Sequence, residues 1–152
     1  KKKIFNKVYI FSHDHHGHYV LSYKMFKDHP IIGTGVKGFR YLCRNKIYIL
    51  EKNDGCSTHP HNYHLEVLHD TGLIGFIFIS IFVLTILIEK TKLILQNKIL
   101  NLNKLVLVLI LLNFMIELFP IKSTGSLFTT WNGTLLWISI ALINLKNYNF
   151  KK

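Results

Sequence analysis

The pattern of hydrophobic and polar positions divides the chain into a mixed first half and an apolar second half. Residues 1–71 alternate charged, aromatic and aliphatic side chains, and long runs of Leu, Ile, Phe and Val follow. Because about 20 apolar residues cross a bilayer, the apolar segments predict transmembrane helices over residues 72–88, 105–119 and 127–145. The pattern indicates an all-α integral membrane protein with about three spans after a helical or irregular loop.

Shorter patterns predict the elements of the first half. Tyr19 to Lys27 has the spacing of a short amphipathic helix. The helix is expected to end at Asp28-His29-Pro30, since the residue before a proline avoids the helical region. The histidine-rich stretch Ser12–His18 is expected to be a polar turn. Pro60 predicts the first turn of a helix that leads directly into the first span.

The charges orient these spans. Residues 89–104, between the first two spans, carry four Lys and one Glu, which is typical of a cytoplasmic loop. Residues 1–71 are then expected on the extracytoplasmic side. Eleven Lys or Arg against four Asp or Glu in residues 1–58 suit anionic lipid headgroups or a diphosphate. The sequence contains no nucleic-acid-binding motif, so nucleic acid is not expected as a partner.

The chain has two cysteines and begins with Lys rather than Met. On the extracytoplasmic side, Cys43 and Cys56 are expected to form a disulfide, with two unpaired thiols as the alternative. We expect the sequence to be the C-terminal part of a longer membrane protein.

All nine histidines lie at or before His69. Four of them form a dense tract: His13, His15, His16 and His18. Such a histidine tract can bind a metal loosely, and the alternative is a solvated loop. Neither this tract nor His61 with His64 has the HExxH order of a zinc hydrolase.

His61 and Asn62 stand at the expected boundary between the polar half and the first span. An imidazole is suited to taking a proton near neutral pH, and a purely structural histidine is the alternative. Glu117 lies in an apolar segment, where ionisable groups are costly and often functional. Its alternative is an ion pair with Lys122.

Two motifs together resemble the O-antigen ligase / O-antigen polymerase (Wzy-type) family. The first is Asp28-His29-Pro30-Ile31-Ile32-Gly33-Thr34-Gly35, followed by Phe39-Arg40. The second is His61-Asn62, then nine residues, then Gly72-Leu73-Ile74-Gly75, which follows the family pattern of His and Asn, Ser or Gln, nine residues and Gly-x-x-Gly. The resemblance covers about residues 25–90, and the remainder in topology only.

The resemblance implies part of a GT-C-like polytopic bundle in the bacterial inner membrane, with its active site facing the periplasm. Such enzymes need no metal or other cofactor. They move a glycan from undecaprenyl diphosphate to an acceptor sugar in cell-surface polysaccharide biosynthesis. The acceptor is lipid A–core in ligases and another repeat unit in polymerases, and nothing in the sequence separates the two. A non-catalytic metal-binding membrane protein remains the alternative from another class.

Carried onto this chain, the family's general base corresponds to His61 and a diphosphate-binding arginine to Arg40. Supporting candidates are Asn62, His59, His64 and Glu117. The family's further spans and upstream arginines are missing from the sequence, so this chain alone is expected to be inactive. His69 stands where relatives often carry Glu.

Overall fold

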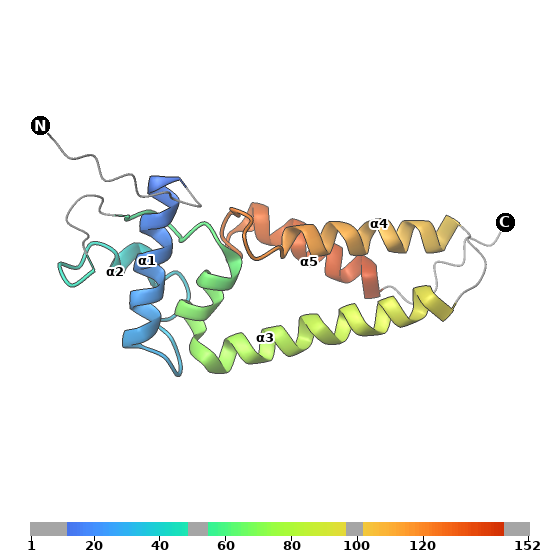
Figure 1. Cartoon of the computed structure of the whole chain (residues 1–152), viewed down its shortest axis with the longest axis horizontal. Coiled ribbons are helices and arrows are strands. Elements are labelled where there is room, and N and C mark those ends of the chain that lie inside the picture. The colour runs from blue at the N-terminus through green and yellow to red at the C-terminus, as the bar shows by residue number, and fades with distance from the viewer. Residues whose placement is uncertain (1–11, 49–54, 97–101, 145–152) are drawn as a thin grey trace, which may run out of the picture.

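The computed structural model describes residues 12–48, 55–96 and 102–144, and all regular structure within them is helical. The helices are α1 (His13–Asp28), α2 (Phe39–Leu42), α3 (Tyr63–Gln96), α4 (Leu102–Glu117) and α5 (Thr130–Asn144). Helices α1 and α2 and the start of α3 gather at one end of the molecule, and α3 then runs away beside the α4–α5 pair (Figure 1). The all-α prediction is confirmed for these residues.

The three predicted spans correspond to α3, α4 and α5. Among the described helices, α3 alone is long and apolar enough to cross a membrane. Helices α4 and α5 have 16 and 15 residues, fewer than the roughly 20 that a span needs. The structure therefore supports a membrane span by α3. Three other expectations stay predictions: the boundary between loop and membrane region at residues 71 and 72, the other two spans, and the polytopic bundle.

Helix α1 begins earlier than the sequence pattern predicted. Ser12 is its N-cap, and the Ser12 Oγ accepts the His15 N–H at 3.4 Å, as capping serines do. The acidic side chain of Asp14 in the first turn suits the positive end of the helix dipole. The expectation of a polar turn over Ser12–His18 is therefore wrong. The predicted end is right, since α1 finishes at Asp28.

Helix α3 begins later than predicted, at Tyr63. His61 has a φ of +56°, which a right-handed helix cannot contain. Asn62 then caps the helix, because its Oδ1 accepts the Leu65 N–H at 3.1 Å. The prediction that Pro60 lies in the first helical turn is wrong, and His61 lies in the loop that precedes the helix.

The two glycine-containing motifs pack directly on each other. The segments around residues 30–35 and 69–73 exchange backbone hydrogen bonds: Thr34 N–H to His69 O at 2.8 Å, Gly35 N–H to Asp70 O at 2.9 Å and Leu73 N–H to Pro30 O at 2.8 Å. A Cβ on Gly33 would collide with the Asp70 backbone, and one on Gly72 with the Ile31 backbone. The glycines are needed because two backbones approach here.

Side-chain packing forms two hydrophobic clusters. The smaller cluster packs α1 against α2 and consists of Leu21, Met25, Phe39, Cys43 and Tyr48. The larger joins α3, α4 and α5 and consists of Tyr63, Val67, Ile86, Leu111, Phe114, Leu127, Leu136 and Ile143.

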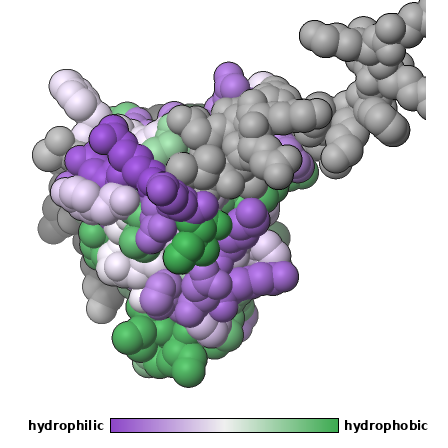
Figure 2. Space-filling model, turned by 90° about the vertical axis from the view of Figure 1, so that its left-hand side faces the viewer, coloured by the Kyte–Doolittle hydropathy of each residue, from purple (hydrophilic) through white to green (hydrophobic). Residues whose placement is uncertain are grey.

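The outer surface also differs between the two ends of the molecule. Hydrophilic side chains cover much of the α1–α2 end, with hydrophobic areas between them (Figure 2). In contrast, α3 to α5 expose large apolar side chains such as Phe78, Leu109 and Leu135. A polar end next to exposed apolar helices is the distribution expected at a membrane boundary.

Candidate histidine site at the polar end

Four imidazoles from two distant segments meet in one cluster. His15 and His18 come from α1, and His59 and His61 come from the loop before α3. The ring centroid of His61 lies 4.1 Å from that of His59, 5.1 Å from that of His18 and 5.5 Å from that of His15. From the sequence, the α1 histidines were expected either to bind a metal loosely or to lie in a solvated loop. The fold places two of them against His61.

The backbone of His61 is held in an uncommon conformation. Its φ of +56° lies in the left-handed region, which costs a non-glycine residue about 1–3 kcal/mol. The loop between α4 and α5 supports it, because the Thr124 N–H donates to the His61 carbonyl at 2.9 Å. Strain of this kind concentrates at functional sites.

The surroundings keep the loop imidazoles neutral. Burial lowers the pKa of His61, and the neighbouring His18 and His15 add to the effect. Burial, together with the charge of His61, lowers the pKa of His59 to about 4. At neutral pH both rings are therefore unprotonated and able to accept a proton.

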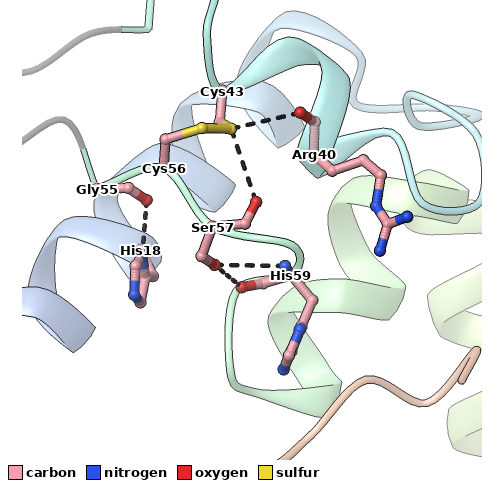
Figure 3. The surroundings of a disulfide bond; sticks show 7 residues. All are labelled: His18, Arg40, Cys43, Gly55, Cys56, Ser57 and His59. Atoms are coloured by element: carbon pink, nitrogen blue, oxygen red, sulfur yellow. Dashed lines mark hydrogen bonds between the residues drawn. A yellow bond between two sulfur atoms is a disulfide. The ribbon is translucent and has the colours of Figure 1, made fainter.

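A disulfide between Cys43 and Cys56 joins the end of α2 to the loop that carries the site histidines (Figure 3). The two Cα atoms are 5.1 Å apart, within the usual range for such a bridge. Next to it, the His18 Nδ1–H donates to the Gly55 carbonyl at 2.6 Å. The Ser57 hydroxyl also donates to the His59 carbonyl. The bridge therefore lies in the scaffold of the cluster.

Arg40 extends from α2 beside this disulfide. Its guanidinium and the His59 ring lie on the same side of the loop in Figure 3, and the charge of Arg40 contributes to lowering the pKa of His59. The side chain is exposed, and no carboxylate of the described residues pairs with it. A cation is thus available to a ligand close to the imidazoles.

Within the described parts of the chain, no three His, Cys, Asp or Glu side chains are placed to hold a metal ion together. His18 already uses its Nδ1 for the Gly55 carbonyl. The metal-binding alternative therefore has no preformed site among these residues.

Comparison with known proteins identifies the segment that builds this site. Residues 19–80 match the family model described as O-antigen ligase. This part of the chain is similar to the O-antigen ligase family. No curated protein and no solved structure matches the chain significantly. The resemblance read from the two motifs is confirmed, and the family indicates a glycosyltransferase-like membrane enzyme of ligase or polymerase type.

Three of the supporting candidates contact the stretch from the end of α4 to α5 instead of the His61 ring. The Asn62 Nδ2 donates to the Pro120 carbonyl at 2.7 Å, and the His64 Nε2–H donates to the Leu118 carbonyl at 2.8 Å. Glu117 forms an ion pair with Lys122 at 2.7 Å. The contacts of Asn62 and His64 tie residues 19–80 to the stretch from the end of α4 to α5, whereas the Glu117–Lys122 pair lies within that stretch.

Two buried carboxylates near the site were missed by sequence reasoning. Glu66 is 2% exposed and accepts hydrogen bonds from the Ser126 hydroxyl at 2.5 Å and the Leu127 N–H at 2.6 Å. Asp70, 1% exposed, accepts the Lys37 N–H at 2.9 Å. The available signal was their i, i+4 spacing in a largely apolar helix, which places both on one face.

Proposed function

We propose that this chain forms the acceptor-activating part of a membrane glycosyltransferase that moves a glycan from undecaprenyl diphosphate to an acceptor sugar. The observation that carries the proposal is the neutral His61 ring, on a strained loop, within the segment of the O-antigen ligase family. The acceptor hydroxyl oxygen bonds to the anomeric carbon, the bond from that carbon to the diphosphate breaks, and the diphosphate leaves with the electron pair.

In this reaction His61 takes the proton of the acceptor hydroxyl. The lowered pKa of His61 means that the ring is already unprotonated at neutral pH and ready to act as a general base. The Thr124 N–H bond to the His61 carbonyl restrains the backbone from which the ring extends. A base held in this way loses little orientational freedom when the acceptor binds.

Arg40 contacts the diphosphate in the proposed mechanism. A guanidinium binds phosphate oxygens through two parallel N–H bonds and stabilises the charge that develops on the leaving group. Its exposed position near His59 brings this cation to the side of the loop that carries the base. The proposed mechanism uses the Arg40 cation and requires no metal or other cofactor. The enzyme is proposed to be of the GT-C-like helical class.

The enzyme is proposed to lie in the bacterial inner membrane, with several spans and its active site facing the periplasm. The basic 89–104 connection supports a cytoplasmic position for the far end of α3. Residues 1–71, with His61 and the disulfide, then lie on the opposite, oxidising side.

Replacing His61 tests the assignment. In the complete protein, H61A is expected to lower the turnover of glycan transfer about 100-fold or more, the usual contribution of a general base. The exposed His29 at the end of α1 supplies the matched control, because H29A leaves transfer unchanged. Membrane fractionation checks that both variants insert. Normal transfer by an inserted H61A protein contradicts the proposal.

The acceptor is proposed to be lipid A–core, as in an O-antigen ligase. The other member of the same class is a polymerase that extends the glycan by further repeat units. Membranes supplied with donor and lipid A–core distinguish the two: glycosylated lipid A–core identifies a ligase, and growth of chain length without it identifies a polymerase.

A further inference from the structure

His15 and His18 enclose the His61 ring from the side of α1. The His18 ring lies at 5.1 Å with an interplanar angle of 33°, and the His15 ring lies edge-on at 5.5 Å and 82°. The two α1 rings are 6.1 Å apart. Their i, i+3 spacing on one helix face makes this arrangement possible, and it requires α1 to begin before His15.

Both enclosing rings are themselves fixed by hydrogen bonds. The Gly55 carbonyl can only accept, so His18 carries its proton on Nδ1 there, at 2.6 Å. The His15 ring bridges two hydroxyls, with Nδ1 at 2.7 Å from the Ser12 Oγ and Nε2 at 3.1 Å from the Ser123 Oγ. Because hydrogen bonds restrain their nitrogen atoms, the His15 and His18 rings restrict the orientation of the His61 ring between them.

The loop between α4 and α5 contacts both His61 and the His15 ring. Ser123 meets the His15 ring, and the next residue, Thr124, donates its N–H to the His61 carbonyl. His61 is therefore held between α1 and the α4–α5 loop, through its ring on one side and its backbone on the other.

We propose that His15 and His18 are positioning residues that hold the His61 ring between them and keep it neutral for proton acceptance. The proposal rests on the proposed role of His61 as the base. It assigns a function to the histidine-rich start of α1, which the family resemblance had left unexplained.

The charges around His61 explain the neutral state. The groups that face the ring or act on its neighbour are His15 and His18 from α1, His59 from the same loop, Arg40 from α2, and the uncharged Ser123 and Thr124 from the α4–α5 loop. This set contains no carboxylate that would stabilise a protonated His61. Protonation of His61 is thus opposed by burial first and by His18 and His15 next.

The sign of the pH effect follows from this. A base works only when it is unprotonated, so activity falls on the acid side as His61 takes up a proton. Replacing either α1 imidazole removes one of the neighbours that oppose protonation of His61 and part of the burial, so the pKa of His61 rises towards the ordinary histidine value. The acid limb of the turnover profile therefore moves to higher pH.

The experiment measures turnover of glycan transfer between pH 5 and pH 9 for the complete protein and for H18N, H15Q and the double variant. Asn at position 18 retains a donor for Gly55, and Gln at position 15 retains a polar group for Ser123. We expect the ratio of turnover at pH 5.5 to that at pH 7.5 to fall about two-fold or more in each single variant and further in the double variant. H29N, at the far end of α1, is expected to keep the parent profile.

Parent-like profiles in H18N, H15Q and the double variant overturn the positioning proposal. A uniform loss of turnover at every pH, with the acid limb unmoved, also overturns it, because it indicates only a structural role. Neither result affects the role of His61, which is judged by the separate loss of transfer in H61A. Transfer retained in H61A instead refutes the base assignment itself.

Discussion

Gly72 and Gly33 approach so closely that a Cβ on Gly72 would lie 2.7 Å from the Gly33 nitrogen. This contact locks the Gly-Thr-Gly loop before α2 onto the point where α3 changes direction. Gly72 has φ +65° and ψ −167°, a conformation that is available essentially to glycine alone. The glycines of the two motifs are thus needed for a contact between two backbones, and the second motif also contains His61.

The G72A variant is expected to be strongly destabilised, by about 3 kcal/mol or more, since backbone strain and a backbone collision both oppose the methyl group. Gly35 is the matched control, because it also has a positive φ, +90°, but nothing lies within 4 Å of its Cβ position. G35A should cost about 1–2 kcal/mol. Thermal unfolding in detergent measures both, and equal losses would show that the contact with residues 31–33 contributes nothing.

Removing the Glu66 carboxylate is expected to release the α4–α5 loop. E66A leaves the Leu127 N–H and the Ser126 hydroxyl without their acceptor, and a loss of about 3 kcal/mol follows from two hydrogen bonds to a charged group. Amide hydrogen exchange at residues 123–128 should accelerate. The partly exposed Glu117–Lys122 pair provides the comparison, since E117A should cost less than about 1 kcal/mol. Unchanged exchange in E66A would argue against this anchoring role.

Loss of the Cys43–Cys56 disulfide is expected to lower stability by about 3 kcal/mol in the chain-entropy model, given the sequence separation of 13. The C43A/C56A variant and the reduced parent protein should therefore unfold at similar, lower temperatures. Reductant should have no effect on the double variant. A parent protein whose unfolding temperature ignores reductant would show that the bridge does not stabilise it.

Substituting Arg40 is expected to weaken binding of the diphosphate donor. R40A should raise the KM for the lipid-linked donor about 10- to 100-fold, the value of a charge-assisted hydrogen-bond pair. R40K should recover only part of the loss, because an ammonium lacks the planar fork. Arg44, exposed four residues later, is the control, and R44A should leave the KM close to that of the parent. An equal effect of R40A and R44A would point to general surface charge.

Much of the architecture could be predicted from the sequence. The apolar runs predicted helices where α3, α4 and α5 lie, and the two motifs with His61 and Gly72 predicted the family. These features are local. A long apolar run predicts a helix, and a fixed spacing of His and Gly identifies a motif, without any knowledge of distant residues. The pairing of Cys43 with Cys56 could be predicted for a different reason, since the chain contains only two cysteines and the predicted topology places both on an oxidising side.

The composition of the site was decided by tertiary packing. Nothing in the spacing of His15 and His18 indicates that their rings meet His61 more than 40 residues later, since this depends on how α1 packs beside the loop. The same holds for Glu66 and Ser126, 60 residues apart. The sequence indicated the apolar helices α3 to α5 and the family resemblance, and it misassigned Ser12–His18 and the start of α3. Only the three-dimensional structure decided which polar groups share a buried environment, because that environment is built by residues distant in the chain.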